Sequence, residues 1–415
     1  MNRVELVSTG DELLSGRTIN SHAQTLGQEL SVIGLRLTRD TTVPDDPQII
    51  REAIQDALNR ANIVFCTGGL GPTDDDVTRA TVAAMLGRKL TPDALALTSI
   101  QKRCETHGND FNEYRIQQAD IIEGATALPN RVGAAPGERL NLENNRTLFI
   151  LPGPPTEFTA ILNDHVLPWL KENITGKSAF MEKIYLTCGL PESDALALFR
   201  ANGFPPSGID IAYCAAAARL EIRLASQSGD LELLNKADAK LRELLGSKLF
   251  ADKRTTMEEI IGKLLTENNA TLAVAESCTG GLLGARITSI PGSSKYFIGG
   301  ILSYSNTVKI DHLGIDPNTL EKDGAVSATV AGQMALGVMK KLNADYGLAI
   351  TGIAGPGGGT TRKPAGLVYI GLANTEKVQT ERHLFGNGRS LVRLAATRMA
   401  LDMLRKHLTK SSQRG

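Results

Sequence analysis

Residues 275–281 have the sequence Ala-Glu-Ser-Cys-Thr-Gly-Gly, between an apolar run at Leu272–Ala275 and an apolar segment at Leu282–Ile290. This order predicts a strand, a tight turn and a helix. Ser277 would then lie beside the free N–H groups of a helix N-terminus, where anions and developing oxyanions are stabilised. Such a serine suits nucleophilic attack on a carbonyl or the binding of a phosphate. On this segment alone, Ser277 or Thr279 acting only as a helix N-cap is the more common interpretation.

Further polar loops follow apolar runs in the same half of the chain. One is Tyr-Ser-Asn-Thr-Val-Lys at residues 304–309. The run Leu348–Ile350 ends in a glycine-rich loop at residues 351–359, and residues 366–372 are expected to form another strand. A terminal helix is expected to begin near Gly386-Asn387-Gly388-Arg389. Because open α/β sheets bind ligands at the ends of their strands, we expect these loops to converge on one site.

The segment from about Thr256 to His407 resembles the C-terminal domain of the CinA family, the nicotinamide-mononucleotide (NMN) deamidases. The resemblance rests on four stretches in the same order, which are AESCTGG at 275–281, YSNTVK at 304–309, GAVS at 324–327 and TGIAGPGGG at 351–359. It implies hydrolysis of the nicotinamide amide of NMN to nicotinic acid mononucleotide and ammonia. We expect no cofactor for this reaction.

Amide hydrolysis needs a nucleophile, a base, an oxyanion hole and a proton for the leaving amine. We predict Ser277 as the nucleophile and Lys309 as its base, which requires a lowered lysine pKa. Tyr304 is the rival for proton transfer, and Cys278 the rival nucleophile, although a small buried residue is its more common role. Taken alone, Lys309 is more commonly a solvated helix-surface lysine. The predicted substrate-binding residues are Thr279 and Gly280 at the oxyanion hole, Asn306, and Thr351, Gly352 and Arg389 for the ribose phosphate.

The N-terminal part of the chain contains a second pair of glycine-rich loops. An apolar run at Val4–Val7, an edge or buried strand, leads into STGDELLSG, and a strand at Ile63–Phe65 leads into TGGLGPTDDD. Glycines let the backbone approach a ligand closely, and a carboxylate beside a phosphate loop is a usual Mg²⁺ ligand. The acidic triplet also precedes a helix expected over Val77–Leu86, and for Asp74 we favour a capping role alone. The predicted metal ligands are Asp75 and Asp76, and the predicted substrate-binding residues are Gly68, Gly69, Gly71, Thr73 and Asp11.

Residues 1 to about 170 resemble the MogA/MoeA-like molybdopterin-binding fold, in the version at the N-terminus of CinA proteins. The matching stretches include LPNRVGAAPG at 128–137 and LPGPPTEF at 151–158 besides the two glycine-rich loops. The resemblance implies an ADP-ribose pyrophosphatase that forms AMP and ribose 5-phosphate and requires Mg²⁺ or another divalent metal. Ala134 stands where the family commonly has Thr, which could remove a phosphate contact. Molybdopterin handling by this domain alone is a weaker alternative.

The middle of the chain predicts a small α+β domain. Residues 219–224 alternate apolar and polar residues, and helices are expected at Glu192–Phe199 and about Asp230–Leu245. By position this segment resembles the KH-like middle domain of CinA proteins. It lacks the GxxG loop with which KH domains clamp nucleic acid, so we interpret it as an interdomain or dimer-forming element.

The predicted organisation is therefore an α/β domain at residues 1–170, an α+β domain at 178–252 and an α/β deamidase domain at 255–410. A polar stretch at residues 171–178 is the candidate linker. Thr255 or Thr256 with Glu258 and Glu259 is expected to begin the first helix of the last domain.

Composition limits the possible functions. Lys plus Arg and Asp plus Glu are both 45, so the zero net charge argues against a general nucleic-acid binder. The five cysteines are odd in number and widely spaced, which fits a reducing cytoplasm rather than a disulfide framework or a metal site. No signal peptide or membrane-spanning stretch is expected. We expect a homodimer, as is usual in the resembled families. A non-catalytic interaction protein of competence and recombination is the alternative function, and the intact Ser277, Lys309, Tyr304 and Thr351 set favours the enzyme.

Overall fold

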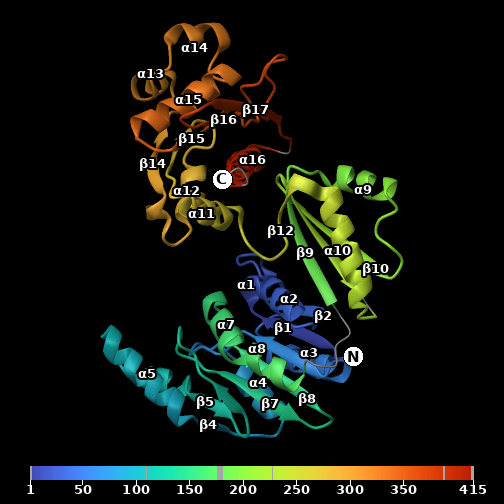
Figure 1. Ribbon diagram of the computed structural model, residues 1–415. Coiled ribbons are helices and arrows are strands. Elements are labelled where there is room, and N and C mark those ends of the chain that lie inside the picture. The colour runs from blue at the N-terminus through green and yellow to red at the C-terminus, as the bar shows by residue number, and fades with distance from the viewer. Residues whose placement is uncertain (1, 109, 175–180, 227, 387, 413–415) are drawn as a thin grey trace. The chain divides into compact units, whose positions relative to one another are not determined.

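Figure 1 shows the computed structural model, which describes residues 2–108, 110–174, 181–226, 228–386 and 388–412. The chain divides into two compact units. One comprises residues 1–182 with 227–229, and the other comprises residues 183–226 with 230–415. The candidate linker at 171–178 falls partly outside the described residues, so the three predicted domain boundaries stay predictions.

The first unit is built on a six-stranded sheet with the order β2-β1-β3-β8-β7-β6. Strands β1, β2, β3 and β8 are parallel, whereas β7 and β6 are antiparallel to their neighbours. All six residues of β1 are buried, so the buried strand rather than the edge strand is the correct alternative. The strands are β1 (Val4–Thr9), β2 (Leu37–Val43), β3 (Ile63–Thr67), β6 (Thr126–Leu128), β7 (Gly137–Leu142) and β8 (Arg146–Leu151).

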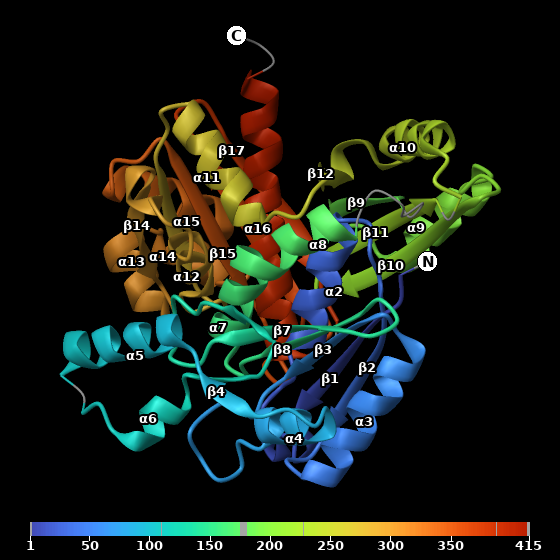
Figure 2. The same ribbon diagram turned by 90° about the horizontal axis from the view of Figure 1, so that it is seen from below.

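Helices cover both faces of this sheet, which is why its central strands are continuous apolar runs. Figure 2 shows α2 (His22–Val32), α7 (Pro155–Ile161) and α8 (Leu167–Asn173) on one face, and α3 (Pro47–Arg60) and α4 (Thr78–Met85) on the other. The remaining elements are α1 (Asp11–Leu14), α5 (Ala94–His107), α6 (Glu113–Gln117), the π-helical η1 (Leu162–Val166), and the paired strands β4 (Leu90–Pro92) and β5 (Asp120–Ile122).

The middle segment forms a four-stranded sheet with two helices, as the predicted α+β domain requires. The sheet order is β10-β11-β9-β12. In β11 the apolar residues Leu220, Ile222 and Leu224 are at most 1% exposed, and their neighbours are partly exposed, which confirms the alternation. The elements are β9 (Met181–Cys188), α9 (Glu192–Ala201), β10 (Ile209–Ala216), β11 (Arg219–Ser226), α10 (Leu231–Leu245), η2 (Gly246–Lys248) and β12 (Leu249–Ala251).

The C-terminal segment is a five-stranded mixed sheet with the order β14-β13-β15-β16-β17. Strands β14, β13 and β15 are parallel, and β16 and β17 continue the sheet in antiparallel hairpins. The edge strand β17 was not predicted, because its alternating polar sequence carries no continuous apolar run. The strands are β13 (Leu272–Glu276), β14 (Phe297–Leu302), β15 (Tyr346–Gly352), β16 (Leu367–Ala373) and β17 (Val378–Leu384).

Helices again cover both faces. One face carries α11 (Met257–Glu267), α12 (Leu282–Thr288) and α16 (Arg389–Ser412), and the other carries α13 (Asn306–Leu313), α14 (Pro317–Asp323) and α15 (Ala328–Lys341). A short 3-10 turn, η3 (Ser293–Lys295), precedes β14. The predicted helix start is confirmed for α11, with Thr256 rather than Thr255 as its N-cap, and Thr256 and Glu259 form a capping box.

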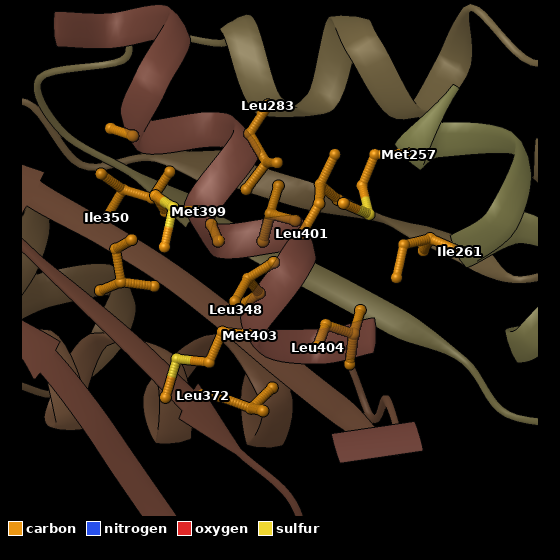
Figure 3. Packing of buried hydrophobic residues seen from close by; sticks show 14 of the residues in the cluster. Met257, Ile261, Leu283, Leu348, Ile350, Leu372, Met399, Leu401, Met403 and Leu404 are labelled. Carbon is orange, nitrogen blue, oxygen red and sulfur yellow. The ribbon is translucent and has the colours of Figure 1, made fainter. Parts of the chain in front are cut away.

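The long helix α16 organises the core of this segment. Figure 3 shows its side chains Met399, Leu401, Met403 and Leu404 among buried residues of β15, β16, α11 and α12. Each fully buried aliphatic side chain of this kind contributes about 1.5–3 kcal/mol relative to an exposed one. Helix α16 therefore fixes α12 against the sheet, and α12 directly follows the turn that contains Ser277. Within the described residues, no helix has the length and apolar character that would let it cross a membrane.

Candidate functional site

Ser277 and Lys309 meet at the end of β13. The Lys309 Nζ lies 3.3 Å from the Ser277 Oγ, although the two residues come from different elements. Lys309 is only 1% exposed and Ser277 is 9% exposed. The solvated-lysine interpretation is therefore wrong, because Lys309 is a buried residue near the start of α13.

The Lys309 amine is buried among oxygen acceptors. Its Nζ donates to the carbonyl oxygens of Ser303 at 2.6 Å and Tyr304 at 3.2 Å. Burial lowers the pKa of Lys309 from its usual value, against a smaller opposing effect of the Cys278 charge. A neutral amine has two N–H donors and one lone pair. In the ammonium form Nζ donates to all three oxygens, including Ser277 Oγ. In the neutral form both N–H groups stay on the carbonyls, and the lone pair is left for the Ser277 hydroxyl proton.

Glu276 supports the turn, and the sequence interpretation assigned it no role. Its carboxylate is 1% exposed and accepts the N–H groups of Gly281 at 3.1 Å, Leu283 at 3.0 Å and Gly284 at 2.8 Å. These are the free donors at the start of α12, and no other side chain caps that helix. The expectation that Ser277 or Thr279 is the N-cap is therefore wrong. The sequence did contain a signal for this role, because Glu276 is an acidic residue at the end of an apolar strand and directly before a glycine-rich turn.

The candidate oxyanion donors, Thr279 and Gly280, differ in whether their N–H groups already have an acceptor. The Gly280 N–H donates to the Ser277 carbonyl at 3.2 Å within the turn. In the described part of the chain, the Thr279 N–H has no acceptor, and its fully buried hydroxyl has none either. The Thr279 carbonyl accepts from Arg393 at 2.6 and 3.2 Å, which orients this peptide. Within the described residues, the unused donors of the turn are therefore the N–H groups of Cys278 and Thr279 and the Thr279 hydroxyl. Arg393 is a further residue that the sequence interpretation missed.

Arg389 connects the glycine-rich loop to Tyr304. Its guanidinium donates to the Gly355 carbonyl at 3.2 Å and lies 3.4 Å from the Tyr304 hydroxyl. The Tyr304 side chain is 66% exposed, and only its backbone carbonyl contacts Lys309. Burial raises the pKa of Cys278 to about 11, although the charges of Arg389 and Arg393 lower it. The Cys278 thiol is therefore protonated at neutral pH, which favours Ser277 over Cys278 as the nucleophile.

The other predicted residues of this domain have packing or surface positions. The Thr351 hydroxyl is buried and donates to the Ala325 carbonyl at 2.8 Å, which joins the glycine-rich loop to the GAVS stretch. A Cβ on Gly352 would come within 2.7 Å of the Leu367 carbonyl, so this glycine permits close pairing of β15 and β16. Asn306 is exposed at the first position of α13, directly after the Ser305 N-cap. The structure thus brings together Ser277, Lys309, Thr279, Gly280, Arg389 and Tyr304 more closely than Thr351, Gly352 and Asn306.

A separate cavity of about 500 Å³ lies in the N-terminal unit. It is lined by five of the predicted residues, Gly68, Gly69, Gly71, Asp75 and Asp76, and by Ala134. Gly68 and Gly69 have φ of +102° and +64°, in the region that favours glycine. A Cβ on Gly68 would come within 2.5 Å of the Thr9 carbonyl, so β1 and β3 approach closely here. Three further carboxylates line the cavity and were not predicted, namely Glu12, Asp45 and Glu157.

The acidic triplet does not cap α4. Its N-cap position is Val77, without a side-chain cap, and the Asp76 carboxylate instead accepts from the Thr73 N–H and hydroxyl. The Asp11 N–H donates to the Asp45 carboxylate at 3.0 Å, so Asp11 acts on the cavity through Asp45. Burial raises the pKa of Asp45, and the negative charges of Asp11, Glu12 and Asp75 raise it further. No group of three or more His, Cys, Asp or Glu side chains within the described residues is arranged to hold a metal ion by itself.

Comparison with known proteins identifies the family. Residues 5–172 match the "Probable molybdopterin binding domain" family, and residues 254–408 match the CinA C-terminal domain. A CinA-like protein of Geotalea uraniireducens (strain Rf4) is 37% identical over 410 residues, covering 98% of this chain and 97% of that protein. The chain belongs to the CinA family. The predicted resemblance and the predicted α/β fold class are thereby confirmed.

Other CinA proteins are similar over the whole chain or one part of it. A CinA-like protein of Thermosynechococcus vestitus is 38% identical over 410 residues, covering 97% of this chain and 98% of that protein. The crystal structure of the competence/damage inducible protein CihA from Agrobacterium tumefaciens is 38% identical, with a TM-score of 0.36. It covers 39% of this chain and 99% of that structure.

Proposed function

We propose that the C-terminal domain hydrolyses the amide of NMN, with Ser277 as nucleophile and Lys309 as base. The observation that carries this proposal is the 3.3 Å contact between two buried groups, Lys309 Nζ and Ser277 Oγ. Burying an amine is costly unless it is well hydrogen-bonded, so this lysine is an expensive residue for a purely structural turn. The contact therefore supports an enzyme over the alternative of a non-catalytic interaction protein.

The chemistry follows from the hydrogen bonds. The neutral Lys309 amine accepts the Ser277 proton as Oγ attacks the carboxamide carbon of NMN. The resulting lysine ammonium returns that proton to the amide nitrogen, the C–N bond breaks, and ammonia leaves. A water molecule then attacks the acyl-serine ester with Lys309 again as base, which releases nicotinic acid mononucleotide. The free N–H and hydroxyl of Thr279 are suited to stabilise the oxyanion, and Arg389 to bind the phosphate.

The two candidate bases, Lys309 and Tyr304, make different contacts. Tyr304 contributes its backbone carbonyl to Lys309, while its hydroxyl lies beside Arg389. Among the described hydrogen bonds, Ser277 Oγ has Lys309 and not Tyr304 as its side-chain partner. We therefore assign proton transfer to Lys309, and to Tyr304 a role in closing the site with Arg389.

Ammonia release from NMN by the purified protein tests the proposal. Ser277→Ala should abolish release and leave the melting temperature close to that of the wild type, since the Ser277 hydroxyl contributes only its contact with Lys309 to the described hydrogen bonds. A Cys278→Ala variant is the matched control at the next position and should remain active. Near-normal turnover by Ser277→Ala would refute the nucleophile assignment.

As a second function we propose ADP-ribose hydrolysis in the N-terminal cavity, because five carboxylates and the glycine-rich loop line it. The described residues fit Mg²⁺ or another divalent ion only if Asp75 and Asp76 share it with substrate phosphates and water, which is the usual magnesium environment. The bound ion would neutralise the pyrophosphate charge. The residues of the chain would orient the substrate through the backbone of Gly68, Gly69 and Gly71. AMP formation with and without Mg²⁺ tests this activity, and binding of molybdopterin without hydrolysis would favour the weaker alternative. We also propose a homodimer, which light scattering of the purified protein would detect.

A further inference from the structure

A second cavity, of about 330 Å³, lies within the unit formed by residues 183–226 and 230–415. Elements from the middle and C-terminal segments line it together. Its apolar wall consists of Cys188, Phe250, Met257, Leu282 and Leu394, and its charged side chains are Glu258, Arg219, Arg286 and Arg398. It shares no residue with the cluster around Ser277 and Lys309, so the proposed deamidase chemistry leaves it unexplained.

The charges in this cavity do not balance. Arg286 forms an ion pair with Glu258 and also donates to the Thr397 hydroxyl. Arg398 donates to the Ala217 carbonyl at 2.6 Å, which is a neutral partner. Within the described residues, neither Arg219 nor Arg398 has a carboxylate at ion-pair distance, and the buried Nε of Arg219 has no acceptor at all. Three guanidinium charges therefore line the cavity with the single carboxylate of Glu258.

Arg219 and Arg398 also act on each other. Burial lowers the pKa of Arg398, and the positive charges of Arg286 and Arg219 lower it further, against a smaller opposing effect of Glu258. A guanidinium nevertheless stays protonated in proteins, so the repulsion is not relieved by loss of a proton. A buried donor without an acceptor adds the desolvation cost of an unmade hydrogen bond. Both costs disappear when an anion with several acceptor oxygens enters the cavity.

We propose that this cavity binds a phosphoryl group of a small molecule, through Arg219 and Arg398. Guanidinium groups bind phosphate oxygens in pairs with charge-assisted hydrogen bonds, which matches two arginines that line the same cavity. The volume is at the lower end of the range for small-molecule sites. The apolar wall beside Phe250 offers a place for an organic group, so both free phosphate and a phosphate monoester satisfy the same chemistry.

Calorimetric titration of the full-length protein with inorganic phosphate, and separately with AMP, tests the proposal. Arg219→Gln is the decisive variant. It removes the guanidinium charge, and the Nε of this side chain has no hydrogen bond to the described residues that the change would break. Arg223→Gln is the matched control on the same strand, where Arg223 pairs with Glu221. We expect Arg219→Gln to weaken the binding of at least one probe by about tenfold or more, and Arg223→Gln to leave it unchanged. Any phosphate site elsewhere in the chain is the same in both variants, so it does not contribute to the difference in affinity between them.

The two probes distinguish the source of the phosphoryl group. A larger loss of affinity for AMP than for phosphate in Arg219→Gln identifies a monoester that also uses the apolar wall, and equal losses identify free phosphate. A thermal shift provides an independent readout, because Arg219→Gln should raise the melting temperature without phosphate and lose the stabilisation that phosphate gives the wild type. The proposal is overturned if Arg219→Gln binds both probes like the wild type, or if no saturable binding occurs up to about 10 mM.

Discussion

Replacing Lys309 with Arg tests the central step of the proposed deamidation. The change keeps a positive charge and hydrogen-bond donors near Ser303 and Tyr304. It removes the ability to become neutral, because a guanidinium has a pKa above about 12 and carries no lone pair for a proton. If Lys309 accepts the Ser277 proton, the variant should fold and bind NMN but not deprotonate the serine.

The magnitude follows from the position of the amine. Lys309 is 1% exposed, and its hydrogen-bond partners are two carbonyls and the Ser277 hydroxyl, so bulk water is poorly placed to replace it. A positioned general base contributes about 10²–10⁴ in rate, so kcat should fall about 10³-fold, or about 4 kcal/mol in activation free energy. The larger guanidinium in a closed site should also cost about 1–3 kcal/mol of stability.

The assay is ammonia release from NMN against pH. The reactive form of Lys309 is neutral, and burial lowers its pKa below the usual 10.5. Wild-type activity should therefore be lost as pH falls through this lowered pKa and should reach a plateau above it. Lys340→Arg, at an exposed position of α15, is the control and should retain both rate and profile. An active Lys309→Arg variant with an unchanged pH profile would refute Lys309 as the base and return that role to Tyr304 or water.

Glu276→Gln should lower the free energy of unfolding by about 2 kcal/mol, because the single amide oxygen cannot accept all three N–H groups at the start of α12. Denaturant titration measures this loss, and the exposed Glu267→Gln is the control that should unfold like the wild type. Thr279→Val should leave stability equal or higher, since its buried hydroxyl has no partner among the described residues, and should lower kcat for NMN hydrolysis by about 10²-fold; an unchanged kcat would exclude this hydroxyl as an oxyanion donor. Asp76→Asn should stop ADP-ribose hydrolysis and spare NMN hydrolysis, whereas Asp74→Asn should affect neither; equal loss in both variants would contradict the assignment.

The elements of the C-terminal domain were predictable where local sequence determines them. The apolar runs that became β13 and β15 are buried between helices on both faces, so continuous hydrophobicity sufficed to predict strands. The capping box of α11 was also predictable, because Thr256 and Glu259 satisfy each other within one turn. The contact between Ser277 and Lys309 was also predicted, but from the motifs of the resembled family and not from a local sequence pattern.

Tertiary contacts explain the parts that were not predictable. Thr351 was assigned to the ribose phosphate, but its hydroxyl proton goes to the Ala325 carbonyl, which is distant in sequence. The acidic triplet has the composition of a helix cap, but the turn from Thr73 to Asp76 closes on itself before α4 begins. The burial of Lys309 depends on β13 and α13 together, and no local pattern distinguishes it from a surface lysine.

The contacts of Glu276 change the role of the turn after β13 in the proposed reaction. A strand-turn-helix segment suggests that the helix N-terminus stabilises the negative charge of the reaction, but Glu276 already accepts the N–H groups of Gly281, Leu283 and Gly284. The partial positive charge of α12 therefore holds the turn in place and is largely screened from a substrate. In the proposed reaction, we therefore assign stabilisation of an oxyanion at Ser277 to the unused donors of Cys278 and Thr279 and to the positive charges of Arg389 and Arg393. This division explains why Arg393 is bonded to the Thr279 carbonyl, since that contact orients the peptide whose N–H would face the substrate.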